Sequence, residues 1–140
     1  MEESSATILA KHSAPSGKSP AIATAVALAG WLVPGLGHLL LWKWGRALVN
    51  FLTVGTLAVV GVALRGNIFF GKGGDTFDFL GFLADLGAGV FYFIARAVAD
   101  GTADVSRAGG DYGTRLFATA GVLNLLCALD AREIARGRKS

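Results

Sequence analysis

Charged residues are scarce in this chain of 140 residues. Asp, Glu, Lys and Arg make up 16% of it, against 53% hydrophobic residues, whereas a soluble domain typically has about 25% charged residues. This shortage excludes an ordinary soluble domain and predicts an integral membrane protein. The net charge of +3 does not predict nucleic-acid binding, because the basic residues are spread along the chain and are densest at its C-terminal end. A basic tail beside anionic lipid accounts for that density.

Cysteine and histidine are also scarce. The single cysteine, Cys127, lies within an apolar run, which excludes an internal disulfide and a Cys-pair metal site, so we interpret it as a small core residue. His38 is the only histidine of the apolar region and has no second His or carboxylate at helical spacing, which makes it a poor metal ligand. No Ser-His, Cys-His, paired-Asp or His-cluster arrangement is present at a readable spacing. We therefore expect no catalytic residue, no metal, no cofactor and no enzyme activity.

Long uncharged runs indicate membrane-spanning helices. Four apolar segments approach the roughly 20 residues that cross a hydrocarbon core, and they predict an all-α, polytopic bundle of about four transmembrane helices with a Pro/Gly break after the first. The 20 glycines predict close helix packing. The predicted organisation is a disordered polar leader (1–19), a four-helix membrane domain (20–131, with helices at approximately 20–42, 46–64, 77–98 and 112–131) and a basic C-terminal tail (132–140).

The distribution of lysine and arginine predicts the orientation. If four helices cross with the N-terminus inside, the cytoplasmic side holds Lys11, Lys18, Arg65, Lys72, Arg132, Arg136, Arg138 and Lys139, and the other side holds Lys43, Arg46, Arg96, Arg107 and Arg115. This excess favours four crossings in the cell inner membrane with both termini cytoplasmic. If the first segment is re-entrant and three helices cross, the bias vanishes, so both possibilities stay open. A cleaved signal peptide is disfavoured, because the apolar run continues past "AVALAG" into Trp31.

The stretch "WLVPGLGHLLLWKWGR" interrupts the first apolar segment. Pro34 lacks a backbone donor and disfavours helical angles at the preceding residue, so the first helix is predicted to end or kink near Val33. Aromatic and basic residues typical of a membrane interface follow, namely Trp42, Lys43, Trp44 and Arg46. The stretch therefore predicts a tight interfacial connection to a second helix beginning near Gly45. We interpret His38 as a turn residue whose ring bonds the backbone carbonyls freed by Pro34 and Gly35.

This connection carries a resemblance. The pattern Pro34-Gly35-Leu36-Gly37-His38, followed by Gly45 before an apolar helix, resembles the signature of the two-transmembrane-helix domain family. It is most similar to small, uncharacterised bacterial membrane proteins with a "PGLGHxYLGxxxxG"-type motif. The resemblance covers residues 21–64 and departs from the motif at Leu40, where tyrosine is usual, and at Trp42, where glycine is usual. It implies a helical hairpin in the bacterial inner membrane with no established chemistry.

Polar residues in the third and fourth apolar segments are the other candidate site. Asp78, Asp85 and Tyr92 are spaced i, i+7 and i+14, which places them on one inward face of a continuous helix. Asp78 is near the helix start, where the helix dipole favours a carboxylate. Asp85 is nearer mid-membrane, where a carboxylate is costly. Asn124 is predicted to lie at a matching depth, and a structural Asp85 is predicted either to be held neutral or to share hydrogen bonds with Asn124.

Two functions remain open. The preferred one is a non-enzymatic accessory, assembly or structural subunit that contacts a larger membrane complex or forms a homo-oligomer in the lipid bilayer. The alternative is a small transporter or proton-conducting element that uses Asp85, with Tyr92 and His38 along its path. Small size favours the first, because four short helices enclose little aqueous path. "GNIFFGKGG" and "HSAPSGKS" each lack a residue that a phosphate-binding loop requires, so we expect no nucleotide.

Overall fold

A computed structural model describes residues 17–71, 73–98, 103 and 106–139 of the chain. The predicted leader (1–19) therefore lies almost entirely outside the described residues. Within them every regular element is a helix, which confirms the all-α class. The helices are α2 (Pro20–Leu32), α3 (Leu36–Leu39), α4 (Trp44–Ala63), α5 (Thr76–Leu86), α6 (Val90–Val98) and α7 (Ala108–Ala135).

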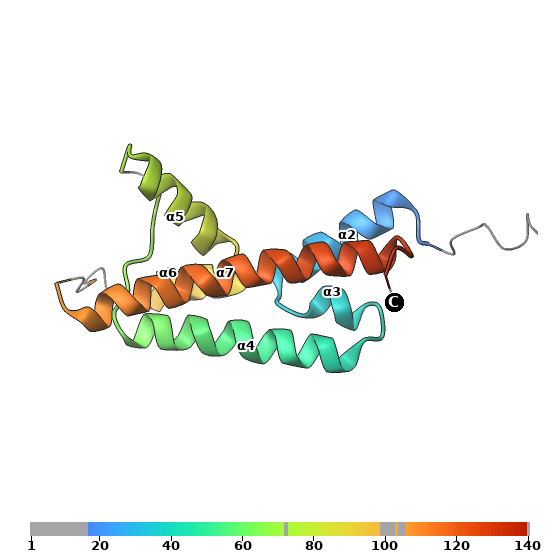
Figure 1. The fold of residues 1–140 in the computed structure, drawn as a ribbon, viewed down its shortest axis with the longest axis horizontal. Coiled ribbons are helices and arrows are strands. Elements are labelled where there is room, and N and C mark those ends of the chain that lie inside the picture. Colours follow the sequence, from blue (N-terminus) through green and yellow to red (C-terminus); the bar gives the residue numbers. More distant parts are fainter. Residues whose placement is uncertain (1–16, 72, 99–102, 104–105, 140) are drawn as a thin grey trace, which may run out of the picture.

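The frame of the molecule is the antiparallel pair α4 and α7 (Figure 1). α4 has 20 residues and α7 has 28, about 30 and 42 Å at 1.5 Å per residue, and both are long and apolar enough to cross a membrane. Glycine lets them approach closely, because a Cβ on Gly61 of α4 would lie 2.9 Å from the Gly113 carbonyl oxygen of α7. Val54, Ala58 and Phe117 are buried between them.

α2 and α3 form a hairpin that enters and leaves at one end of this frame. α2 has 13 residues, about 20 Å, which is less than the roughly 30 Å of a hydrocarbon core. It begins where the Lys18 N–H donates to the Ala135 carbonyl oxygen (2.8 Å). After the turn at Pro34 and Gly35, α3 runs back toward the start of α4. The first helix thus ends next to Val33, as Pro34 predicts. The remainder of the range 20–42 turns back, so four crossings are not confirmed.

The helix predicted over 77–98 is also divided. α5 and α6 are inclined at 111° across a break of three residues, 87–89. Gly89 has a φ of 61°, which glycine adopts without strain, and a Cβ there would overlap the Trp31 carbonyl oxygen. Figure 1 shows both helices opening from this break toward the end where α7 begins, with α5 inclined away from the frame.

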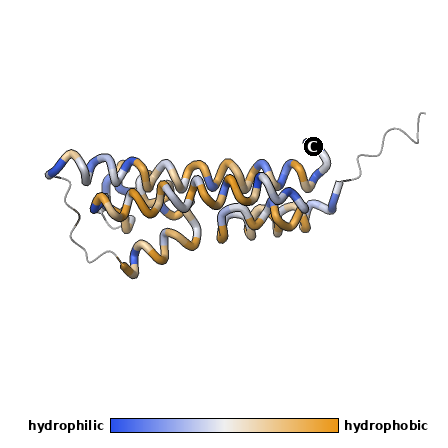
Figure 2. The backbone as a smooth tube through the Cα atoms, turned by 90° about the horizontal axis from the view of Figure 1, so that it is seen from below, coloured by the Kyte–Doolittle hydropathy of each residue, from blue (hydrophilic) through white to orange (hydrophobic). Residues whose placement is uncertain are grey.

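The hydropathy of the chain follows this arrangement. Hydrophobic residues dominate the middle of the molecule, and hydrophilic residues are more frequent toward its two ends (Figure 2). In the part of the chain that the structure describes, two helices, or three spans if the bent α5–α6 pair counts as one, have the length and composition of membrane spans. These properties indicate a membrane protein.

Candidate functional site

The α2–α3 hairpin and the bent α5–α6 pair, which we call the second hairpin, meet at their turns in the middle of the molecule. We call this cluster the tip junction (Trp31, Leu86, Gly87 and Asn124). Asn124 is fully buried on α7, and its Nδ2 donates to the Trp31 carbonyl oxygen (2.8 Å) and to the Gly87 carbonyl oxygen (2.9 Å). Trp31 Nε1 donates to the Leu86 carbonyl oxygen (3.1 Å). Carbonyls at a helix C-terminus lack partners within the helix, and an unpaired one is costly away from water. The junction therefore supplies hydrogen-bond donors to the carbonyls at the ends of both α2 and α5.

Asp85 and Tyr92 act together on one residue of the loop after α4. The Phe69 N–H donates to Asp85 Oδ2 (2.8 Å), and the Tyr92 hydroxyl donates to the Phe69 carbonyl oxygen (3.3 Å). Asp85 and Tyr92 are both buried. The predicted stripe needs a continuous helix, which the break at 87–89 removes, yet Phe69 still links the two side chains. Asp78 lies apart at the start of α5, where it accepts the Gly73 N–H (2.8 Å).

The predicted hydrogen bond between Asp85 and Asn124 is wrong, because each side chain has other partners. Asp85 bonds the Phe69 N–H and Asn124 bonds the two carbonyls of the tip junction. Their remaining oxygens, Asp85 Oδ1 and Asn124 Oδ1, are buried and have no hydrogen-bond partner in the part of the chain that the structure describes.

The glycines of the opening motif differ in what they do. Gly35 has a φ of 87° and a Cβ there would overlap the Ala47 carbonyl oxygen, while a Cβ on Gly37 would lie 2.9 Å from the Val26 carbonyl oxygen. Both glycines are needed for close backbone packing, around a fully buried Pro34. Gly45 has no such role, since a Cβ there meets nothing within 4 Å.

The predicted interfacial anchors lie at one end of the molecule. Trp42 and Trp44 are 82% and 64% exposed, with ring centroids 6.5 Å apart. Lys43 precedes the first residue of α4. Arg46 faces the polar cluster described next.

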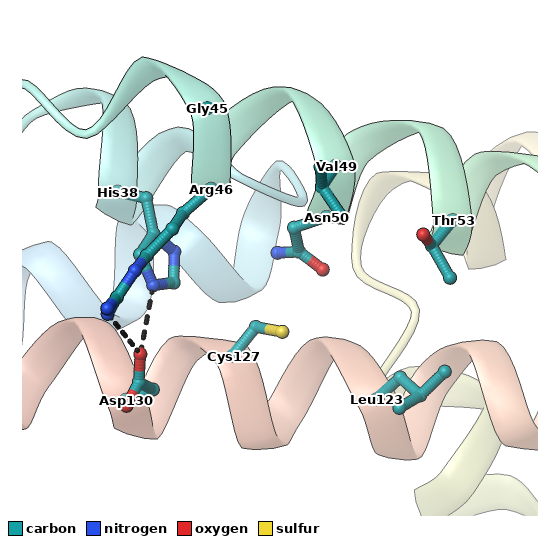
Figure 3. A pocket seen from close by; sticks show the side chains of 9 residues that line it. All are labelled: His38, Gly45, Arg46, Val49, Asn50, Thr53, Leu123, Cys127 and Asp130. Carbon is teal, nitrogen blue, oxygen red and sulfur yellow. Dashed lines mark hydrogen bonds and ion pairs between the residues drawn. The ribbon is translucent and has the colours of Figure 1, made fainter.

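A pocket of about 450 Å³ lies between α3, α4 and α7 and holds the polar residues of that end (Figure 3). At its outer end, Asp130 Oδ2 lies 3.3 Å from His38 Nε2 and 3.5 Å from Arg46 Nη1, and Asp130 Oδ1 accepts from Lys139 Nζ (2.9 Å). His38 is buried. Its predicted partners were backbone carbonyls of the turn, and the structure corrects them to the carboxylate of α7. We call this cavity the α4–α7 pocket; its lining is His38, Gly45, Arg46, Val49, Asn50, Thr53, Leu123, Cys127 and Asp130.

Sequence reasoning missed Asp130 and Asn50. Asp130 is 92 residues from His38, so no local spacing relates them, although it is the only acidic residue within the predicted helix 112–131. Asn50 is 7% exposed and is the only amide of the predicted helix 46–64. A lone polar residue in an apolar helix is the signal that points to each of them.

The chemistry available at this end is binding through hydrogen bonds and charge. Across residues 17–71, 73–98, 103 and 106–139, no group of three or more His, Cys, Asp or Glu side chains is placed to hold a metal ion. Cys127 lines the pocket at one turn from Asp130, on the same face of α7.

Comparisons with known proteins give one match. A family model matches residues 25–140, which include both helix breaks, the tip junction and the pocket. The expected similarity of residues 21–64 to the two-transmembrane-helix domain family finds no support, because the model is that of a different family. No curated protein matches the chain, and no solved structure matches it. The chain therefore belongs to DUF6677, a family of unknown function.

Proposed function

We propose that this protein is a non-enzymatic subunit of the bacterial inner membrane that acts through helix–helix contacts, as an accessory or assembly factor of a larger membrane complex or as a homo-oligomer. The observation that supports this proposal is the placement of α5. This apolar helix is inclined away from the α4–α7 frame (Figure 1) and keeps large hydrophobic side chains on its surface, namely Phe77, Phe79, Leu80 and Leu83.

One face of α5 is covered and the other is not. Phe69 packs against Gly81, where a Cβ would lie 2.5 Å from the ring, and the Gly87 end of α5 rests on Gly121 of α7. Phe77, Phe79 and Leu80 are 80%, 55% and 55% exposed. A cluster of this kind favours packing against another helix, which in membranes depends on van der Waals contact.

The polar side chains near α5 favour a function in helix–helix contact over a function in proton transport. Asp85 and Tyr92 hold Phe69, and Asn124 holds the tip junction. Side chains that bond the fold itself are engaged in stabilising irregular backbone, which membrane proteins tolerate only where it is satisfied internally.

We also propose an orientation. In this topology α4 and α7 cross, and the two hairpins re-enter from opposite ends. Among the described residues, the end where α7 finishes carries seven cations and the other end four: Lys18, Lys43, Arg46, Arg132, Arg136, Arg138 and Lys139 against Arg65, Arg96, Arg107 and Arg115. The positive-inside rule makes the first end cytoplasmic, with both termini.

Site-specific photocrosslinking in native membranes tests the contact function. A photoreactive residue at Phe79 should give a crosslinked protein or a dimer. The matched control at Leu126, an exposed apolar position of α7 (57%), should give lipid adducts. The double change Phe77→Ser and Leu80→Ser should abolish co-purification of that partner in mild detergent, whereas Leu126→Ser should preserve it. Lipid adducts alone at both positions, with a monomer in detergent, would contradict the proposal.

The alternative function, a proton-conducting element that uses Asp85, is favoured by one observation. Asp85 is fully buried and its Oδ1 has no partner among the described residues. A titratable group in this position is a candidate proton carrier, and the Asp85 variants in the Discussion separate this function from the first.

A further inference from the structure

We propose that the α4–α7 pocket binds one membrane lipid with an anionic phosphate headgroup, with the headgroup at Arg46 and Lys139 and an acyl chain directed along Val49 and Leu123. This inference concerns a ligand site and does not depend on the contact function of α5.

The pocket has the size and direction that such a ligand needs. Its volume of about 450 Å³ lies within the roughly 300–1,000 Å³ of ligand pockets. Its lining runs from Arg46 to Thr53 on α4 and from Asp130 to Leu123 on α7, eight residues on each, which rise by about 10 Å. Both helices have the length and composition of membrane spans, so the pocket runs from the headgroup level toward the hydrocarbon core.

Asn50 places an amide inside the pocket. Its side chain is more than nine-tenths buried and extends from α4 into the space facing α7 (Figure 3). It has no hydrogen-bond partner among the residues that the structure describes. The amide opens onto the pocket, where it offers both donors and an acceptor to a ligand. The ester and glycerol oxygens of a lipid have the chemistry to use them.

The outer end of the pocket has an excess of positive charge. The single carboxylate of Asp130 is shared by Arg46 and Lys139, which are full cations, and by His38. One negative and two positive charges leave a net positive site without any contribution from His38. Glu133 pairs with Arg138 at the same end, and the further cations Arg132 and Arg136 add to the attraction for anionic headgroups.

The inner part of the pocket selects a lipid over a free anion. Apart from Asn50, the lining away from the charged end consists of Val49, Thr53, Leu123 and Cys127, which offer no further charge. A soluble phosphate would leave this apolar volume empty, whereas an acyl chain fills it and removes its surface from polar contact.

The test uses the full-length protein in phosphatidylcholine nanodiscs with a small fraction of phosphatidylglycerol as the probe. Native mass spectrometry should detect one retained phosphatidylglycerol per chain. Asn50→Leu, which removes the amide and fills space, and Arg46→Gln should each weaken retention at least tenfold. Arg115→Gln, an exposed cation of the opposite end paired with Asp111, is the matched control and should leave retention unchanged. Retention by all variants alike, or equal retention of phosphatidylcholine, would overturn the proposal.

A second measurement needs no variant, since Cys127 lines the pocket and is the only cysteine of the chain. Phosphatidylglycerol should slow alkylation of its thiol by a small maleimide at least fivefold in detergent, whereas phosphatidylcholine should not. Millimolar inorganic phosphate is the arm that separates the two sources of a phosphate group. Equal protection by inorganic phosphate would assign the site to a soluble anion, and no protection by the lipid would leave the pocket without the proposed occupant; either result overturns the inference.

Discussion

Asn124 shows how one side chain stabilises two breaks in the fold. Its amide donates to one carbonyl from each interrupted segment, Trp31 and Gly87, and both acceptors lie far from it in the sequence. A leucine has the same branching and supplies no donor. The amide therefore joins the tips of the two hairpins, together with the direct hydrogen bond from Trp31 Nε1 to the Leu86 carbonyl oxygen.

We expect Asn124→Leu to lower the stability of the protein by about 1–3 kcal/mol, because two hydrogen bonds are lost and two buried carbonyls lose a donor. The measurement is thermal unfolding in mild detergent, or reversible unfolding in mixed micelles. Leu125→Ala, an adjacent and partly exposed position, serves as the control and should cost less than about 1 kcal/mol. Equal losses for the two variants would show that the amide has no special role.

Variants of Asp85 test whether its carboxyl group is structural or carries protons. Asp85→Asn keeps an oxygen that accepts the Phe69 N–H, so its melting temperature should change little. Asp85→Leu leaves that N–H without an acceptor and should lose about 1–3 kcal/mol. Acid-driven proton flux in reconstituted vesicles completes the experiment, and we expect none from wild type or Asp85→Asn. Wild-type flux that disappears in Asp85→Asn at an unchanged melting temperature would establish the transport function.

The sequence predicts which polar residues are buried, but it does not predict their hydrogen-bond partners. Asp85, Tyr92 and Asn124 stand out as polar residues of apolar segments, and all three are buried. Their partners are backbone groups of Phe69, Trp31 and Gly87, which carry no side-chain signal. The contact between His38 and Asp130 joins residues 92 apart, and one sequence contains nothing that pairs them.

The helices divide into continuous and interrupted ones, and glycine accounts for the difference. α4 contains Gly55 and Gly61 without interruption, because both keep helical angles. Gly35 and Gly89 have positive φ and lie against backbone carbonyls of other elements. The break at Pro34 was predictable because proline removes a donor. The break at 87–89 was not predictable, since the presence of glycine in an apolar segment does not reveal whether the helix packs closely there or is interrupted.

We expect Gly89→Ala to be strongly destabilising. The left-handed conformation alone costs a non-glycine residue about 1–2 kcal/mol, and the added Cβ overlaps the Trp31 carbonyl oxygen, so the loss should exceed about 2 kcal/mol. Gly45→Ala tests the opposite case, because its Cβ meets nothing within 4 Å and alanine favours a helix; it should be neutral or slightly stabilising. Thermal unfolding of both variants in the same detergent is the measurement, and a harmless Gly89→Ala would contradict the described break.

The arrangement of the helices in the whole molecule differs from the four-crossing topology that the sequence favours. The sequence separates the Trp42 region from the C-terminal end, whereas Arg46 and Lys139 meet at Asp130 in the structure. The apolar runs predict that helices form. Whether a run of about 20 residues crosses or turns back depends on packing against α7, which local composition does not encode.

Cysteine labelling distinguishes the two topologies. In a Cys127→Ala background, single cysteines replace Trp42, Phe70, Ser106 or Arg138. A membrane-impermeant thiol reagent should label two of these positions from each side of the membrane. We expect Trp42→Cys and Arg138→Cys to react from the cytoplasmic side, and Phe70→Cys and Ser106→Cys from the other. With four crossings, Trp42→Cys would instead react together with Ser106→Cys, and Phe70→Cys together with Arg138→Cys.

The packing of α2 against α7 has a consequence for the order in which the protein is made. Ala23 and Val26 near the beginning of the chain are buried against Ala131 and Ala135 near its end, and Lys18 bonds the Ala135 carbonyl oxygen. A ribosome releases the first hairpin long before it synthesises the helix that covers it. The nascent hairpin must therefore remain at the membrane without its partner until the last helix is inserted. Any chain that stops before residue 108 lacks α7 and leaves the surface of Ala23 and Val26 uncovered.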